Sequence, residues 1–345
     1  MTTTKLFILG ATGYIGGEVL HKFLLQYPDA HVIALVRTQA KADLLKQAIN
    51  GNLETVIGDL NSLDVIEENV AKADIVINAA SNNHLPSLEA IKTSLIAKKT
   101  RTLFIQTSGA GVIADSTDPT KQNPNKVYSD VKDIDEINSL PDSQPHRLAD
   151  KLVQTFKESS KVVETAIISP PTIFGVSNGF DHKTSVQIPL LAKAITKVGY
   201  SFTVYKGDTY WSHVHISDLG DLYVLIIEKF LKQQDFPSGY KGYYFAAGGT
   251  PHSWKDVSVA VSKLLVEKKL ISSDKIEQLN PDQVQKVFGL PALFWGSNAK
   301  TDADLGKQIG WEPKKSSDKE FWEDIEIEID YLKKTGYFEG ELKSH

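Results

Sequence analysis

The sequence predicts an α/β fold in which a doubly wound parallel sheet is joined to a smaller C-terminal lobe. Short apolar runs alternate with amphipathic segments as far as residue 170. A glycine-rich turn follows the first apolar run, and the alternation breaks into shorter pieces after Pro171. Strands separated by helices pair in parallel, because a parallel connection needs a crossover of a dozen or more residues. We therefore expect one strand-helix domain followed by a lobe of different construction.

The apolar runs are predicted to be six strands, at Leu6–Leu9, His31–Arg37, Thr55–Ile57, Asp74–Asn78, Thr102–Gln106 and Val162–Ile168. The segments between them are predicted to be helices, at Tyr14–Gln26, Ala40–Ile49, Ser62–Ala71, Leu85–Lys99 and Arg147–Ser159. We place a first domain at 1–170 and a substrate lobe at 171–345. Within that lobe, residues 213–247 are expected to return to the main sheet.

Composition indicates a globular protein that acts on a small molecule. The chain has 345 residues, of which 41% are hydrophobic, and its net charge is only -5. No basic block is present to recruit nucleic acid or a membrane surface. The absence of cysteine excludes thiol catalysis, and we predict no metal site. The apolar run Leu6–Leu9 is too short for a secretion signal, so the cytoplasm is the expected location.

The glycine-rich turn is Gly10-Ala11-Thr12-Gly13-Tyr14-Ile15-Gly16-Gly17. Gly10 permits a tight turn, Gly13 lets the backbone approach a phosphate, and Gly16 allows the helix to pack closely on the strand. A purely structural turn is the alternative. Because the motif follows a strand and opens an amphipathic helix, it predicts a Rossmann domain with a dinucleotide at the helix N-terminus.

The end of the second strand bears on which dinucleotide is bound. An acidic residue there would accept hydrogen bonds from the ribose 2′-hydroxyl of NAD, but this strand ends in Arg37. A guanidinium suits the 2′-phosphate of NADP(H), which we therefore favour, although Arg37 could simply be a solvated charge. Asp59 is predicted either to reach the adenine or to cap the next helix.

Several further motifs resemble those of the short-chain dehydrogenase/reductase superfamily, in the extended and atypical branches that include sugar-nucleotide epimerases, dihydroflavonol-type reductases and NmrA-like proteins. These motifs are Gly58-Asp59-Leu60, Asn78-Ala79-Ala80, Thr107-Ser108-Gly109, Pro170-Pro171-Thr172-Ile173-Phe174-Gly175 and His213-Val214-His215-Ile216-Ser217-Asp218. The resemblance covers most of the chain. It implies the Rossmann fold and a nicotinamide cofactor, and it leaves the substrate open.

Position by position, the resemblance implies that Ser108 is the catalytic hydroxyl, that Ala79 and Ala80 line the cofactor, and that Pro170 lies beside the nicotinamide. It implies that further cofactor contacts come from Thr12, Tyr14, Ile15, Leu60, Thr107 and Arg147.

The family also uses a tyrosine and a lysine four residues apart on one helical face, where the ammonium lowers the pKa of the phenol. Tyr128 and Lys132 have this spacing, but they precede the expected helix and fall in a long insertion, 111–145. This insertion could fold back as a lid that brings Tyr128 over the nicotinamide. Alternatively, His146 or Arg147 replaces the pair, or catalysis has been lost.

Three functions follow from these alternatives. The first is an NADP(H)-dependent oxidoreductase that reduces a small aldehyde or ketone, with Ser108, Tyr128 and Lys132 as its catalytic residues. The second is a sugar-nucleotide epimerase or dehydratase, which the scarcity of arginine disfavours because such sites clamp a diphosphate. The third is a non-catalytic NADP(H) sensor resembling NmrA. We expect the first, an enzyme that acts on a small molecule, and the family resemblance implies a homodimer.

Overall fold

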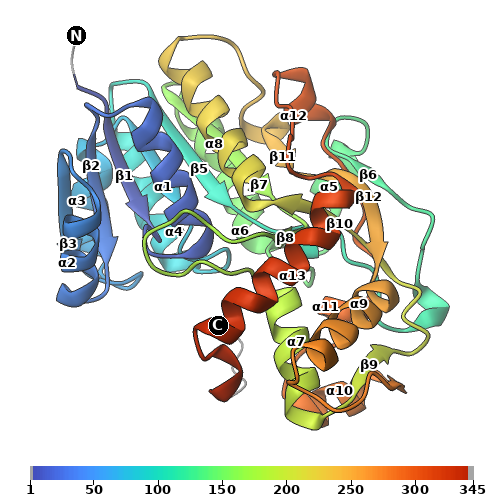
Figure 1. Ribbon diagram of the computed structural model, residues 1–345. Helices are drawn as coiled ribbons and strands as arrows, with labels where there is room; N and C mark the ends of the chain where they lie inside the picture. The colour runs from blue at the N-terminus through green and yellow to red at the C-terminus, as the bar shows by residue number, and fades with distance from the viewer. Residues whose placement is uncertain (1–2, 341–345) are drawn as a thin grey trace.

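A seven-stranded parallel sheet forms the centre of the computed structural model, which describes residues 3–340 (Figure 1). The ends of the two predicted domains, residues 1–2 and 341–345, lie outside this range. The strand order is β11-β7-β5-β4-β1-β2-β3. The order reverses between β1 and β4, and ligands of such sheets bind in the crevice outside the carboxyl ends of the strands at this point.

The strands of this sheet are β1 (Lys5–Leu9), β2 (His31–Val36), β3 (Leu53–Ile57), β4 (Ile75–Asn78), β5 (Thr102–Thr107), β7 (Val163–Ser169) and β11 (Tyr243–Phe245). The first six match the predicted strands to within two residues at each end. Every residue of β4 and β5 is buried, as expected for strands that are covered on both faces. The seventh strand, β11, comes from the second half of the chain and pairs in parallel with β7.

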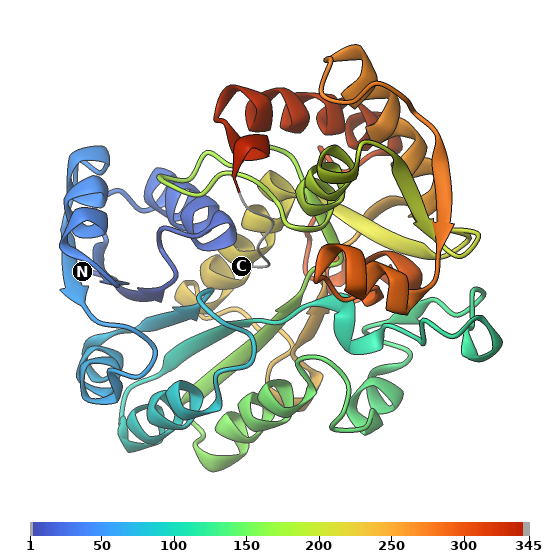
Figure 2. The same cartoon turned by 90° about the horizontal axis from the view of Figure 1, so that it is seen from below.

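Helices cover both faces of the sheet (Figure 2). One face carries α1 (Tyr14–Gln26) packed beside α8 (Ile216–Leu231), and the other carries the row α3 (Leu63–Lys72), α4 (Leu85–Ala97) and α6 (Arg147–Ser159). The helix α2 (Gln39–Ala48) joins β2 to β3. The bounds of α1 and α6 agree with the predicted ones. No helix within residues 3–340 combines the length and apolarity needed to cross a membrane.

The second lobe contains two small sheets, β12-β10-β8 and β13-β9. Their strands are β8 (Thr172–Phe174), β9 (Ser201–Val204), β10 (Tyr210–His215), β12 (Gly248–Ser253) and β13 (Ile276–Leu279). The helices are α7 (Gln187–Val198), α9 (Trp254–Glu267), α10 (Pro281–Phe288), α11 (Leu293–Gly296), α12 (Asp304–Gln308) and α13 (Asp318–Lys334). One continuous hydrophobic core joins this lobe to the main sheet.

The insertion 111–145 is not the structureless loop that its composition predicts. It contains the short strand β6 (Tyr128–Ser129), which pairs with β14 (Thr301–Asp302), and the helix α5 (Ile134–Ser139). The carboxylate of Asp115 accepts hydrogen bonds from the backbone and side chain of Asn298, at 2.7 and 2.9 Å. The insertion is therefore fastened along the C-terminal part of the chain.

Candidate functional site

The glycines of the turn differ in how much room they leave for a side chain. A Cβ at Gly16 would lie 2.2 Å from the carbonyl oxygen of Gly10, and one at Gly10 would lie 2.6 Å from the backbone of Ala79. At Gly13, by contrast, the only atom of residues 3–340 within 4 Å of an added Cβ, its two chain neighbours aside, would be the Gly10 oxygen, at 3.2 Å. Gly10 and Gly16 therefore hold the helix close to two strands, and Gly13 leaves its outer side open.

The open side of Gly13 is also the beginning of a helix. Gly13 is the N-cap of α1, and no side chain caps it. The first backbone N–H groups of a helix lack partners within the helix, so together with the helix dipole they favour an anion. These features fit the pyrophosphate of a dinucleotide.

The end of β4 lies on the other side of the crevice from the glycine turn. The glycine turn, the start of α1 and the end of β4 are together called the cradle here. The backbone of Ala79 is bonded to β1 through its N–H and the carbonyl of Leu9, at 2.9 Å. The backbone N–H of Ala80 donates to the side chain of Asn78, at 3.2 Å. The structure thus brings Ala79 and Ala80 beside Gly10, at the point where the strand order reverses.

The remaining residues predicted for the cofactor loop and strand ends have varied surroundings. The hydroxyl of Tyr14 donates to the carbonyl of Gly175, at 2.6 Å, and the hydroxyl of Thr107 bonds to that of Tyr223, at 2.7 Å. Burial raises the pKa of the Tyr14 phenol well above its usual value. Ile15 and Leu60 are half-buried against the core. The hydroxyls of Tyr14 and Thr107 are thus engaged within the protein rather than free in the crevice.

Arg37 and Asp59 follow the carboxyl ends of two adjacent strands. The backbone N–H of Gly58 donates to the carbonyl of Val36, at 3.0 Å, which aligns the two strand ends. Arg37 is exposed and has no hydrogen-bond or ion-pair partner among residues 3–340. Asp59 accepts a bond from the backbone of Asn61, at 2.8 Å. Arg37 is therefore available to a ligand, and Asp59 shapes the turn before α3.

Ser108, the predicted catalytic hydroxyl, donates to the carboxylate of Asp150, at 2.8 Å. The hydroxyl of Tyr243 donates to the same oxygen, at 2.9 Å. Ser108 follows β5, Asp150 lies on α6 and Tyr243 on β11, and all three side chains are buried. Burial raises the pKa of Asp150 to about 7, against the bonds from Ser108 and Tyr243, which lower it. Asp150 is not among the residues predicted from the sequence, although an acid in the first turn of a buried helix is a signal of such a contact.

We expect the stability of the protein to report this titration. Because the folded state raises the pKa of Asp150 from 3.8 to about 7, the folded state holds the proton more tightly, and stability falls as pH rises between these values. Relative to Asp150→Asn, the free energy of unfolding should fall by about 1.4 kcal/mol per pH unit over this range. Urea unfolding of both proteins at pH 5, 6, 7 and 8 measures the difference.

The control for this experiment is Asp142→Asn, which removes an exposed carboxylate bonded to Lys151. Its unfolding free energy should follow the wild type at every pH. Parallel curves for the wild type and Asp150→Asn would contradict the assigned titration.

His146 lies over the ends of β4 and β5. Its Nδ1 atom is 3.2 Å from the side-chain oxygen of Asn83, in the loop after β4. Its Nε2 atom lies 3.1 Å from the position of a Cβ added at Gly109 and 3.4 Å from one at Gly111. His146 has a left-handed backbone, with φ of 67°, as the N-cap of α6. Such strained non-glycine residues occur preferentially at functional sites.

Burial lowers the pKa of His146 to about 4, so the imidazole is neutral at pH 7. If Nδ1 carries the proton, it donates to Asn83 and Nε2 presents its lone pair toward Gly109 and Gly111. Since Gly109 directly follows Ser108, the imidazole lies against the backbone of the residue next to the predicted catalytic serine.

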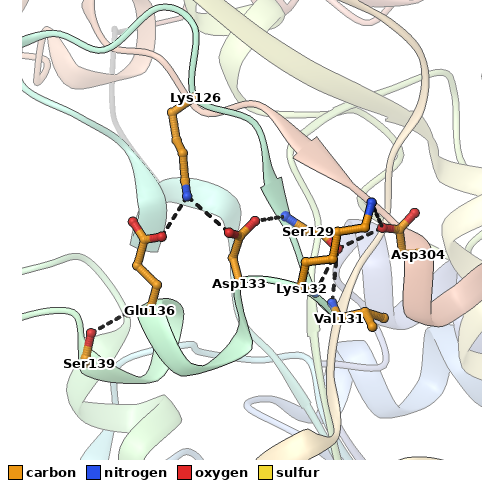
Figure 3. Close-up of polar contacts among 8 residues, drawn as sticks. All are labelled: Lys126, Ser129, Val131, Lys132, Asp133, Glu136, Ser139 and Asp304. Carbon is orange, nitrogen blue, oxygen red and sulfur yellow. Dashed lines mark hydrogen bonds and ion pairs between the residues drawn. The ribbon is translucent and has the colours of Figure 1, made fainter.

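Tyr128 and Lys132 lack the geometry on which their prediction as a catalytic pair rested. Tyr128 lies on the strand β6, not on a helix, with the ammonium of Lys126 4.5 Å from its ring centre. The side chain of Lys132 is 78% exposed, and its Nζ atom is 3.7 Å from Asp304 (Figure 3). Burial raises the pKa of the Tyr128 phenol, the reverse of the effect that a catalytic tyrosine needs.

The same cluster explains why this segment is fixed. Lys126 bonds to both Asp133 and Glu136, and the hydroxyl of Ser129 donates to Asp304, at 2.7 Å (Figure 3). These contacts hold the segment against α12 and leave it no lid-like position in this structure.

Arg147 also departs from its predicted place at the cofactor. Its side chain is buried, and its guanidinium donates to the backbone carbonyls of Asn138 and Leu140. The arginine thus holds the end of the insertion against α6. It is the preceding residue, His146, that faces the ends of β4 and β5.

Comparisons with known proteins agree with a nucleotide-binding fold. Residues 10–171 match a family model described as NAD(P)H-binding. The chain is 31% identical over 327 residues to a protein of Acremonium sp named oxidase ucsJ, with 90% of this chain and 93% of that protein covered. It is 25% identical over 323 residues to an uncharacterised protein of Saccharomyces cerevisiae, with 90% and 94% covered.

Solved structures share the fold at low sequence identity. A dTDP-glucose 4,6-dehydratase from Bacillus anthracis, solved in complex with NAD, gives a TM-score of 0.68 at 14% identity, with 97% of this chain and 98% of that chain covered. A UDP-glucuronic acid 4-epimerase from Bacillus cereus, in complex with UDP-glucuronic acid and NAD, gives 0.67 at 15% identity, with 96% and 100% covered. At these identities the likeness shows a common fold.

Proposed function

The chain belongs to the extended short-chain dehydrogenase/reductase superfamily, among its NAD(P)-binding, epimerase/dehydratase-like members, and on that premise we propose that it is an NADP(H)-dependent oxidoreductase that reduces a small carbonyl compound. The observation that carries this proposal is the imidazole of His146, which Asn83 orients and which lies against Gly109, the residue after Ser108, over the ends of β4 and β5. Hydride transfer to a carbonyl needs a proton donor at that place.

The cradle fits a dinucleotide by its shape. Gly13 is open on its outer side, while Gly10 and Gly16 admit no side chain. Gly13, Tyr14 and Ile15 would hold the pyrophosphate with the N-terminus of α1, and Ala79 and Ala80 would line the adjoining crevice. When bound, the cofactor supplies the hydride that reduces the carbonyl carbon.

His146 supplies the proton to the carbonyl oxygen in this proposal. In the protonated imidazole, Nδ1–H is held by Asn83 and Nε2–H faces Gly109 and Gly111. Transfer of the Nε2 proton yields the alcohol and returns the imidazole to its neutral form. Because burial lowers the pKa of His146 to about 4, the protonated form becomes more abundant as pH falls, and reduction should speed up toward acid pH.

Ser108 has a positioning role beside this donor. Its hydroxyl proton is committed to Asp150, and the residue after it, Gly109, is the one against which His146 lies. The bond to Asp150 fixes the rotamer of Ser108. In this proposal the imidazole of His146, which Asn83 holds at Nδ1, takes the place of the family's Tyr–Lys pair.

The preference for NADP(H) rests on Arg37. Its guanidinium is exposed at the end of β2 with no partner among residues 3–340, and no carboxylate occupies the position that would bind the 2′-hydroxyl of NAD. We expect Arg37→Ala to weaken NADPH binding by about tenfold, the loss of one charge-assisted contact of about 1.4 kcal/mol. NADH binding should change less than twofold.

Titration of purified protein with each cofactor, followed by fluorescence of the nicotinamide, measures both dissociation constants. Arg101→Ala is the control, because Arg101 donates to the carbonyl of Phe230, away from the crevice. Equal losses for NADPH and NADH in Arg37→Ala would contradict the preference.

A panel of small aldehydes, ketones and diketones with NADPH tests the reaction itself. Oxidation of NADPH that depends on the carbonyl supports the reductase. NADPH binding without turnover of any compound would instead support the second candidate, a non-catalytic NADP(H) sensor, which the position of Tyr128 on a strand and not on a helix favours.

A further inference from the structure

The segment 175–183, here called the clasp, lies across the beginning of α1 (Figure 1). The two ends of the clasp meet, since the backbone N–H of Ser177 donates to the carbonyl of Lys183, at 2.9 Å. Between them, the backbone N–H of His182 donates to the carbonyl of Thr12, at 3.2 Å, in the glycine turn. The clasp is therefore bonded directly to the loop that forms the dinucleotide cradle.

A buried carboxylate on α1 anchors the clasp. Glu18 is 0% exposed, and it accepts hydrogen bonds from the hydroxyl of Ser177, at 3.0 Å, and the backbone N–H of Asn178, at 2.6 Å. Gly17 and Gly179 allow close approach, because a Cβ at Gly179 would lie 2.9 Å from the backbone of Gly17. Residues 177–179 of the clasp are therefore fixed against α1, next to the glycine turn.

The far part of the clasp reaches a second element. The carboxylate of Asp181 lies 2.5 Å from the ammonium of Lys41, in the first turn of α2. The N-cap of α2 is Thr38, which directly follows Arg37. The clasp therefore connects the phosphate-binding turn to the end of β2, where the 2′-phosphate of NADP(H) is expected.

We propose that Asp181 is a specificity-determining residue whose carboxylate competes with the 2′-phosphate of NADP(H) for the ammonium of Lys41. The inference rests on the proposed function for the position of the dinucleotide. NADH lacks the 2′-phosphate and leaves the pair intact. To bind, the 2′-phosphate of NADPH must draw the Lys41 ammonium away from Asp181. It then also lies near the negative charge of the Asp181 carboxylate, which repels it. Asp181 thus lowers the preference that Arg37 and Lys41 create.

The surroundings of the pair make this competition feasible. The side chains of Lys41 and Asp181 are 39% and 26% exposed, so water screens their attraction. Partly exposed pairs contribute little to stability. A phosphate carries more charge than a carboxylate and would also interact with the N-terminus of α2, which has no acidic residue in its first turn. The phosphate can therefore displace Asp181.

The test compares Asp181→Asn with the wild type in dissociation constants for NADPH and NADH. We expect Asp181→Asn to bind NADPH about fivefold more tightly, which corresponds to about 1 kcal/mol, and NADH within twofold of the wild type. The matched control is Asp221→Asn, which also removes a carboxylate paired with a lysine, Lys22, at 2.7 Å, and changes the net charge equally. This control should leave the ratio of the two constants unchanged.

Lys41→Gln is the second variant and should shift the ratio in the opposite direction, with NADPH weakened at least fivefold. An unchanged ratio in Asp181→Asn, or a shift of both variants in the same direction, overturns the proposal. The test compares the ratio of the NADPH and NADH dissociation constants between variants, so it can be read whichever cofactor the wild type prefers. It needs no turnover, so a failure of the carbonyl assay and a failure of this inference remain distinct.

Discussion

Replacing His146 with asparagine is expected to lower kcat for carbonyl reduction by about 10² to 10⁴-fold, the usual contribution of a positioned proton donor. Asparagine tolerates the left-handed backbone that residue 146 adopts, so the fold should persist. The dissociation constant for NADPH should stay within about twofold, because the cradle lies on other residues. Steady-state kinetics of NADPH oxidation, with cofactor binding measured separately, gives both quantities.

Tyr128→Phe is the matched variant for this experiment, since it removes the hydroxyl of the originally predicted donor. We expect its kcat to equal that of the wild type, because Tyr128 lies on β6 beside Lys126. The rise in rate toward acid pH should persist in Tyr128→Phe and disappear in His146→Asn. A large loss in Tyr128→Phe with full activity in His146→Asn would reinstate the Tyr128 and Lys132 pair.

The second large effect is expected for Gly16→Ala. The added methyl group would lie 2.2 Å from the carbonyl oxygen of Gly10 and 3.3 Å from the Cβ of Ala79. Backbone atoms of a tight turn cannot move aside as a flexible side chain can, so the helix must shift away from the sheet. We expect a loss of about 3 kcal/mol or more in the free energy of unfolding, measured by urea denaturation.

Gly13→Ala separates folding from binding in the same turn. Its added methyl group would meet only the Gly10 oxygen, at 3.2 Å, among residues 3–340, and the backbone φ of -80° suits alanine. This variant should unfold near the wild-type urea concentration but bind NADPH much more weakly, because the methyl group occupies the open side of the turn. Wild-type stability in Gly16→Ala would show that the helix is not held as the glycines indicate.

The sequence predicts the main sheet and its cofactor loop because their signals are local. The bounds of α1 and α6 follow from apolar periodicity. The glycine turn needs a strand before it and a helix after it, and all of these lie within the first 26 residues. The signal for the end of β2 is equally local, so the position of Arg37 just after this strand could be predicted from the sequence.

The parts that the sequence did not reveal depend on distant contacts. Strand β6 forms only because residues 301–302 lie beside it, and nothing near Tyr128 indicates that partner. The bond between Ser108 and Asp150 spans 42 positions, and that between Glu18 and Ser177 spans 159.

The pairing of β11 with β7 also constrains how the chain can be made and folded. During synthesis β7 emerges long before Tyr243–Phe245, so its unpaired edge is exposed while some seventy further residues are added. An exposed edge strand is a template for association with other chains. Asp130, whose carboxylate bonds the backbone of Phe245 at 2.9 Å, then fastens the late strand to a segment already present. Full assembly of the seven-stranded sheet therefore has to wait until the chain has been made at least as far as Phe245.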